Sequence, residues 1–187
     1  MKMNEVTQIL TALGWSIHVD EVGDKVAHFA LSDRVVDIIY GIRKFSQDEQ
    51  FEATLSTSTS TFSVACIGIR GGGGKYTPLV RAQKGLRIRA PEILPEHIRQ
   101  ASDEAIAWAR EQDLDKALRD HAALPTNAPG ARPIWHLAAL AVLGDVAKLK
   151  SYQASFEGGD RLGFVPYVTK DYIDRAVEIA GKFAAHA

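Results

Sequence analysis

The sequence has little of what covalent cross-linking or membrane insertion requires. Cys66 is the only cysteine among the 187 residues, so no disulfide can form within the chain. It lies in the apolar run VACIGI, where nothing would lower its pKa, which favours a buried structural thiol over a nucleophile. No stretch approaches the roughly 20 apolar residues of a membrane span, and Glu5 falls where a signal peptide would need an apolar run. We therefore expect a cytoplasmic protein.

An excess of charge of one sign is also missing. The 22 lysine and arginine residues nearly balance the 23 aspartate and glutamate residues, for a net charge of −1. No overall field therefore attracts nucleic acid or an anionic membrane, and we expect neither as a partner. The charges are unevenly distributed, because residues 70–99 hold seven basic and two acidic side chains, whereas residues 1–60 hold five and nine. This asymmetry suits a protein partner or a homodimer contact.

The sequence lacks the motifs of the common chemistries. It contains no H-E-x-x-H, no cysteine cluster and no nucleophile with a neighbouring base, so a non-enzyme is favoured and no cofactor is expected, with a divalent metal as the one alternative. The glycine-rich run GIRGGGGKYT falls short of a phosphate-binding loop. Ile69 stands where the first glycine belongs and Tyr76 replaces the Ser or Thr, so we interpret the run as a loop between strands.

The chain is organised around the stretch from Arg34 to Arg70. The segments RVVDIIYGIRK, FEATLSTS and TFSVACIGIR are rich in β-branched and aromatic residues. Their composition predicts strands over residues 34–44, 51–57 and 61–69, separated by short polar or Ser/Thr clusters.

Helical patterns flank this stretch on both sides. Apolar residues recur at helical spacing from Val6 to Leu13, and again after residue 91, so helices are predicted in both regions. We expect an α+β fold with an N-terminal helix, an antiparallel meander sheet of about 5–7 strands over residues 15–90, and a C-terminal helical half packed on one face of the sheet. All 187 residues are expected to form a single domain, with a sheet half at 1–90 and a helical half at 91–187.

Two short alternating segments begin the predicted sheet. Residues 15–21 and 25–31 alternate apolar and polar side chains around Gly23. A three-residue loop at residues 22–24 and a two-residue turn at residues 32–33 set a register that gathers the apolar side chains on one face.

The same register gathers polar side chains on the opposite face. It places His18 directly opposite His28, and His28 opposite Asp37, in one row across three strands. Two imidazoles and a carboxylate could bind Zn²⁺ or another divalent metal, or act as a His–Asp general base. The alternative is a solvated or helix-covered polar row in which Asp37 simply pairs with a histidine.

A second candidate cluster lies in the helical half. The irregular segment EGGDRLGFVPY contains Arg161 and Tyr167, and such loops often line binding sites. Together with His136 these residues form a candidate ligand-binding cluster. The alternative is a plain connection between helices with Phe164 packed in the core.

The predicted order of helix, meandering sheet and helix over about the first 120 residues resembles type III secretion chaperones and related small bacterial binding proteins. This resemblance is one of architecture and implies binding of another protein through the sheet. We therefore expect a non-catalytic protein-interaction module of chaperone-like, immunity-like or adaptor type. The alternative is a small-ligand-binding protein or a metal-dependent enzyme with a pocket between the sheet and the helices.

Overall fold

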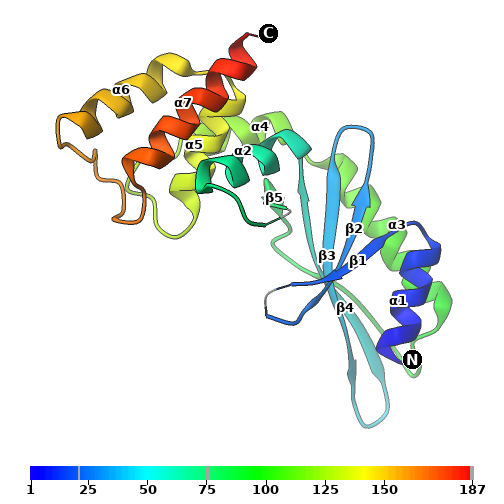
Figure 1. Cartoon of the computed structure of the whole chain (residues 1–187). Helices are drawn as coiled ribbons and strands as arrows, with labels where there is room; N and C mark the ends of the chain where they lie inside the picture. The colour runs from blue at the N-terminus through cyan, green and yellow to red at the C-terminus, as the bar shows by residue number, and fades with distance from the viewer. Residues whose placement is uncertain (21, 75, 186–187) are drawn as a thin grey trace. The chain divides into compact units, whose positions relative to one another are not determined.

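The computed structural model describes residues 1–20, 22–74 and 76–185. Within these ranges the chain forms seven helices and a six-stranded antiparallel sheet (Figure 1), which confirms the predicted α+β class. The chain is made of two compact units. The sheet unit comprises Met1–Ser58 and Val80–Gln112, and the helical unit comprises Thr59–Leu79 and Asp113–Ala187. That all 187 residues form a single domain stays a prediction.

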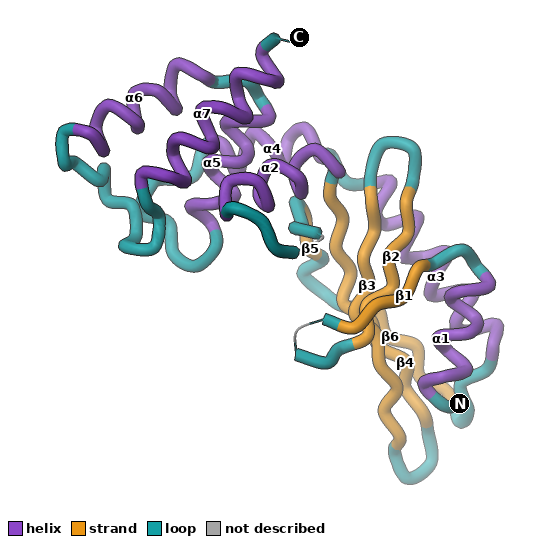
Figure 2. Tube along the Cα trace, in the orientation of Figure 1, coloured by secondary structure: helices purple, strands orange, loops and turns teal. Residues whose placement is uncertain are grey.

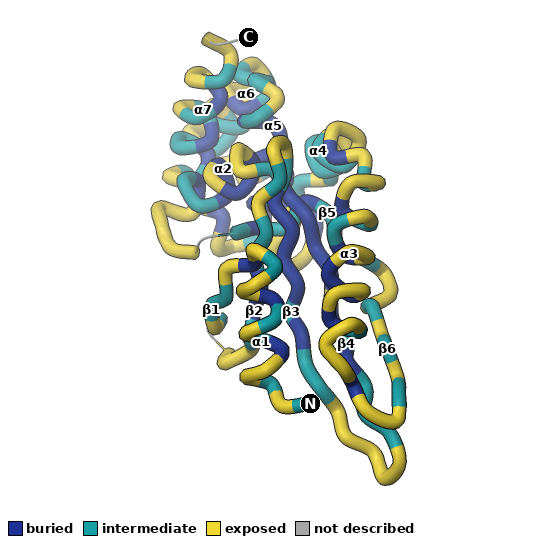
Figure 3. The backbone as a smooth tube through the Cα atoms, turned by 90° about the vertical axis from the view of Figure 1, so that its right-hand side faces the viewer, coloured by how far each residue is buried: buried dark blue, intermediate teal, exposed yellow. Residues whose placement is uncertain are grey.

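The first four strands of the sheet unit follow one another as an antiparallel meander (Figure 2), and the last two strands both pair with the fourth. The strands are β1 (Ser16–Val19), β2 (Lys25–Ala30), β3 (Val35–Lys44), β4 (Glu49–Ser58), β5 (Val80–Arg81) and β6 (Leu86–Ala90). The spatial order is β1-β2-β3-β4-β5, and β6 also pairs with β4. The first half of β3 and the second half of β4 are mostly buried, whereas the tip of their hairpin is exposed (Figure 3).

Two helices of the sheet unit cover one face of the sheet. Helices α1 (Met3–Ala12) and α3 (Pro95–Glu111) contact each other and the strands. The predicted alternation places Trp15 and Ile38 in this core, each 1% exposed. The indole N–H of Trp15 donates to Ser102 Oγ on α3 at 2.8 Å, so even the polar atom of this side chain is satisfied inside the core.

The predicted register is correct for one hairpin and wrong for the other. Strands β2 and β3 pair with His28 opposite Asp37, across the predicted two-residue turn. In the β1–β2 hairpin, however, His28 lies opposite Ser16, so the prediction that it faces His18 is wrong. The cause is Asp20, whose carboxylate accepts the N–H groups of Val22 and Asp24 and closes the turn one residue earlier than predicted. This slip of two residues keeps every side chain on its predicted face.

The strand predicted over residues 61–69 is a helix, α2 (Ser60–Arg70). Thr59 caps it by accepting the Phe62 N–H at 3.1 Å, so the Ser/Thr cluster ends a strand and starts a helix. Phe62 and Cys66, four residues apart, share the buried face, and burial raises the pKa of Cys66 to about 12. The expected buried thiol is therefore confirmed, although on a helix.

The helical unit packs around its central helix. Its helices after α2 are α4 (Leu114–Ala122), α5 (Arg132–Val142), α6 (Val146–Glu157) and α7 (Lys170–Ala184). Helix α5 contacts α2, α4, α6 and α7. Of the helices predicted after residue 91, α3 thus packs on the sheet, and α4 to α7 belong with α2 to the helical unit. None of the helices in the described residues has the length and apolar character to cross a bilayer.

Candidate functional site

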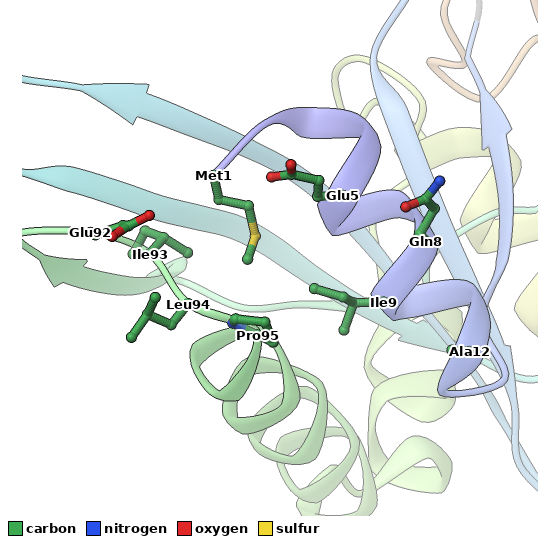
Figure 4. A pocket seen from close by; sticks show the side chains of 9 residues that line it. All are labelled: Met1, Glu5, Gln8, Ile9, Ala12, Glu92, Ile93, Leu94 and Pro95. Carbon is green, nitrogen blue, oxygen red and sulfur yellow. The ribbon is translucent and has the colours of Figure 1, made fainter.

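A groove of about 420 Å³ lies in the sheet unit between α1 and the segment that leads into α3 (Figure 4). Helix α1 contributes Ile9, and residues 92–95 contribute Leu94 from the other side. Leu94 is 38% exposed although it is a large apolar side chain. The lining is mostly apolar, so the groove can take up apolar side chains from water.

The backbone explains why apolar side chains reach this surface. Helix α1 buries Val6 and Leu10 in the core, which leaves Ile9 at the edge of the covered face. Residues 92–95 run between the sheet and α3, where Ile93 is buried and Leu94 points outward. Leu94 has extended φ and ψ angles and precedes the first helical residue of α3.

One carboxylate fixes the two walls of the groove. Glu49 at the start of β4 accepts hydrogen bonds from the Met1 amine at 2.6 Å and from the Ile93 N–H at 3.1 Å. It also pairs with Lys44 at 3.0 Å. The Met1 amine, the Ile93 N–H and the Lys44 ammonium lower the pKa of Glu49 to about 2. The start of α1 and the approach to α3 are therefore tied to the same strand.

The rim of the groove is acidic. Glu5 and Glu92 are exposed at its mouth, and neither a lysine nor an arginine is present among the nine described residues that line it. Glu5 also accepts the Lys2 backbone N–H at 2.7 Å. An apolar floor with carboxylates at the edge suits a ligand that combines apolar and cationic groups.

The histidine row predicted on the opposite face of the sheet is formed in part. His28 Nδ1 lies 2.6 Å from Asp37 Oδ1. Asp37 is only 5% exposed, and its hydrogen bond and negative charge raise the pKa of His28 despite partial burial of the imidazole. His18 lies opposite Val26, so it does not join this pair across the strands.

The described residues contain no group of three or more His, Cys, Asp or Glu side chains placed to hold a metal ion. The register continues the row of His28 and Asp37 to Ser56 on β4 and Arg81 on β5. The result is a polar row across the sheet whose chemical role stays a prediction.

His136 of the second predicted cluster is completely buried in the helical unit. Its Nδ1 lies 3.2 Å from the His121 carbonyl and its Nε2 lies 3.1 Å from the Tyr152 hydroxyl. Burial lowers the pKa of His136. Because a carbonyl can only accept, Nδ1 carries the proton and Nε2 accepts from Tyr152.

Arg161 and Tyr167 both hold loop backbone in place. One guanidinium nitrogen of Arg161 donates to the carbonyls of Val165 at 3.0 Å and Val168 at 2.7 Å. The Tyr167 hydroxyl donates to the Gly130 carbonyl at 2.6 Å, and its ring lines a pocket of the helical unit. The structure thus gives His136, Arg161 and Tyr167 separate contacts, and a shared ligand stays a prediction.

The groove was missed at the sequence level. Ile9 belongs to the same apolar pattern as the core residues of α1, and Leu94 stands beside a buried isoleucine. The only signal was an apolar pair between Pro91 and Pro95, because two prolines hold the intervening residues in an extended segment.

Comparison with known proteins gives a family but no activity. The model of a family of unknown function (DUF6990) matches residues 2–181. No curated protein and no solved structure matches the chain.

Proposed function

The chain belongs to this family of unknown function, and we propose that it is a non-catalytic protein-interaction module. In this proposal the sheet unit binds a segment of another protein in the groove between α1 and residues 92–95. The observation that carries the proposal is the exposure of Leu94, 38%, beside Ile9 in an acidic-rimmed apolar groove. A chaperone-like or adaptor role in the cytoplasm is part of the same proposal.

The groove fits one or two anchor side chains of a partner. Small numbers of buried apolar anchors supply most of the affinity at protein interfaces. Its volume of about 420 Å³ falls in the range of roughly 300–1,000 Å³ typical of ligand pockets. A short segment with a large apolar residue is therefore a better fit than a broad flat surface.

The carboxylates around the groove indicate which residues flank the apolar anchor in the partner segment. Glu92 lies at the mouth of the groove, and Glu96 is exposed in the first turn of α3. Lysine or arginine residues beside the apolar anchor would be attracted to these carboxylates, whereas acidic segments would be repelled. The proposed partner segment is thus apolar at its centre and basic at its flanks.

A random 12-residue peptide library selected against the immobilised chain tests this proposal. The expected result is enrichment of peptides with one or two large apolar residues next to Lys or Arg. In fluorescence anisotropy, Leu94→Asp should lower the affinity for a selected peptide by about tenfold or more, because it places a charge at the apolar anchor site. Aspartate is also a favourable residue at the start of a helix, so α3 is expected to remain folded.

The matched control is Val22→Asp, which changes another exposed apolar residue of the sheet unit, 81% exposed. This variant should bind the peptide as the unmodified chain does. Selection without a common motif, or equal effects of the two variants, would overturn the proposal. So would a chain that sediments as a dimer and becomes monomeric only in Leu94→Asp, because the groove would then hold a second copy.

A further inference from the structure

A second pocket, of about 320 Å³, lies wholly within the helical unit. Arg70 comes from the end of α2, Trp135 from α5, Tyr167 from the loop before α7 and Tyr172 from α7. Four residues from separate segments therefore meet at one surface hollow, and three of them are aromatic. The groove described above belongs to the sheet unit and shares none of these residues.

Arg70 is held in position by neutral groups. Its Nε donates to the Cys66 carbonyl at 3.3 Å and its Nη2 donates to the Thr77 hydroxyl at 3.1 Å. Thr77 is itself only 5% exposed. No carboxylate of the described residues forms an ion pair with Arg70. The guanidinium is thus oriented while its charge has no anionic partner in the described part of the chain.

A second guanidinium lies against the ring of Tyr172, which lines the pocket. Arg175 stacks on the Tyr172 ring at 5.0 Å and donates from Nε to the Ile69 carbonyl at 2.7 Å. A cation beside a tyrosine ring adds positive potential at the wall. Arg70 and Arg175 together make this end of the helical unit attractive to an anion.

The aromatic side chains are also fixed. Tyr167 is anchored by its hydroxyl to the Gly130 carbonyl, yet it remains 44% exposed. Trp135 packs against the His121 ring in an edge-on contact at 5.4 Å. Rings held in this way offer a planar molecule a surface on which to stack at little entropic cost.

We propose that this pocket binds a small planar anion, that is, an aromatic or heteroaromatic ring that carries a phosphate or a carboxylate. The rings of Trp135, Tyr167 and Tyr172 would contact the planar part, and Arg70 would bind the anionic group. Guanidinium groups match phosphate and carboxylate geometry with two parallel hydrogen bonds. This site is independent of the proposed protein-binding groove.

Titration of the chain with four probes tests the proposal. The probes are AMP and indole-3-acetate, which are planar anions, adenosine, which has the ring without the charge, and inorganic phosphate, which has the charge without a ring. We expect saturable binding of at least one planar anion by calorimetry, tighter than that of adenosine or phosphate by about tenfold. Binding of AMP but not of indole-3-acetate would indicate a phosphate ligand, and the reverse result would indicate a carboxylate ligand.

Substitutions then locate the binding site. Arg70→Ala should lower the affinity for the planar anion by about ten- to a hundredfold, because it removes a charge-assisted hydrogen bond. Arg70→Lys should restore part of the affinity, and thermal unfolding of both variants checks that they fold. Arg99→Ala, which removes an exposed arginine of the sheet unit, is the matched control. Saturable binding of neither anion, equal affinity for adenosine, or an unchanged affinity in folded Arg70→Ala would each overturn the proposal.

Discussion

His28 and Asp37 form a side-chain pair across β2 and β3, with His28 Nδ1 2.6 Å from Asp37 Oδ1. The carboxylate is nearly inaccessible, whereas the imidazole side chain is 30% exposed. A buried carboxylate needs a donor to compensate for its loss of hydration. The partly exposed imidazole is such a donor and can exchange its proton with solvent, so the pair responds to pH.

This pairing predicts a pH-dependent contribution to stability. Because Asp37 raises the pKa of His28 above 6.5, the protonated pair stabilises the fold fully below pH 6.5. The contribution is lost as the pH rises through the higher pKa of the folded chain. The unfolding free energy from urea titrations should therefore decrease with pH just above 6.5.

Asp37→Asn should remove this pH dependence and return the pKa of His28 toward its ordinary value, as measured by NMR of the imidazole. Loss of a charged hydrogen bond predicts a destabilisation of about 1–3 kcal/mol at pH 6. Asp103→Asn on the exposed face of α3 is the control and should leave both quantities unchanged. An unchanged pKa of His28 in Asp37→Asn would contradict the assignment.

Glu49 predicts a second pH dependence of the opposite sign. Its pKa falls from 4.5 to about 2 because it accepts hydrogen bonds from the Met1 amine, the Ile93 N–H and Lys44. A lowered pKa stabilises the fold above pH 4.5, and this stabilisation disappears as the pH falls from 4.5 toward 2. Glu49→Gln should therefore be less stable than the unmodified chain at pH 7 and lose less stability between pH 4.5 and pH 2. If the unfolding free energies of the two chains fell by the same amount between pH 4.5 and pH 2, this role of Glu49 would be disproved.

Trp15 and Ser102 form a buried hydrogen bond in the core of the sheet unit. Ser102→Ala removes the acceptor of the indole N–H, which is held at 2.8 Å between two nearly inaccessible residues. An unsatisfied buried donor costs about 1–3 kcal/mol. Chemical unfolding should show this loss for Ser102→Ala and almost none for Ser32→Ala in the exposed β2–β3 turn. In a double-mutant cycle, Trp15→Phe should reduce the effect of Ser102→Ala, since the donor is then absent.

Local sequence determined the features that depend on local turns. The two-residue turn between β2 and β3 fixes the register that joins His28 to Asp37, so this pair could be predicted. The register of His18 could not, because it depends on which backbone groups the Asp20 side chain accepts. The predicted sheet face of each side chain stays correct despite this error, because a slip of two residues preserves the alternation of a strand.

The groove and the pocket depend on contacts between distant segments. Ile9 and Leu94 line one groove, and Arg70 and Trp135 line one pocket, although each pair is far apart in the sequence. Hydrophobic periodicity identifies the buried face of each helix, but it carries no information on which helices lie side by side. Only the tertiary structure shows these sites.

Residues 61–69 give the sharpest test of local structure, because strand and helix place Val64 differently. In a strand, Val64 shares a face with Phe62 and Cys66. In helix α2 it is 66% exposed while Phe62 is inaccessible. Val64→Glu should therefore change the unfolding free energy by less than about 0.5 kcal/mol, since exposed helix positions tolerate glutamate. Phe62→Ala should cost about 3–5 kcal/mol because it opens a cavity. A comparable loss in both variants, measured by urea unfolding, would show that the segment is a strand in solution.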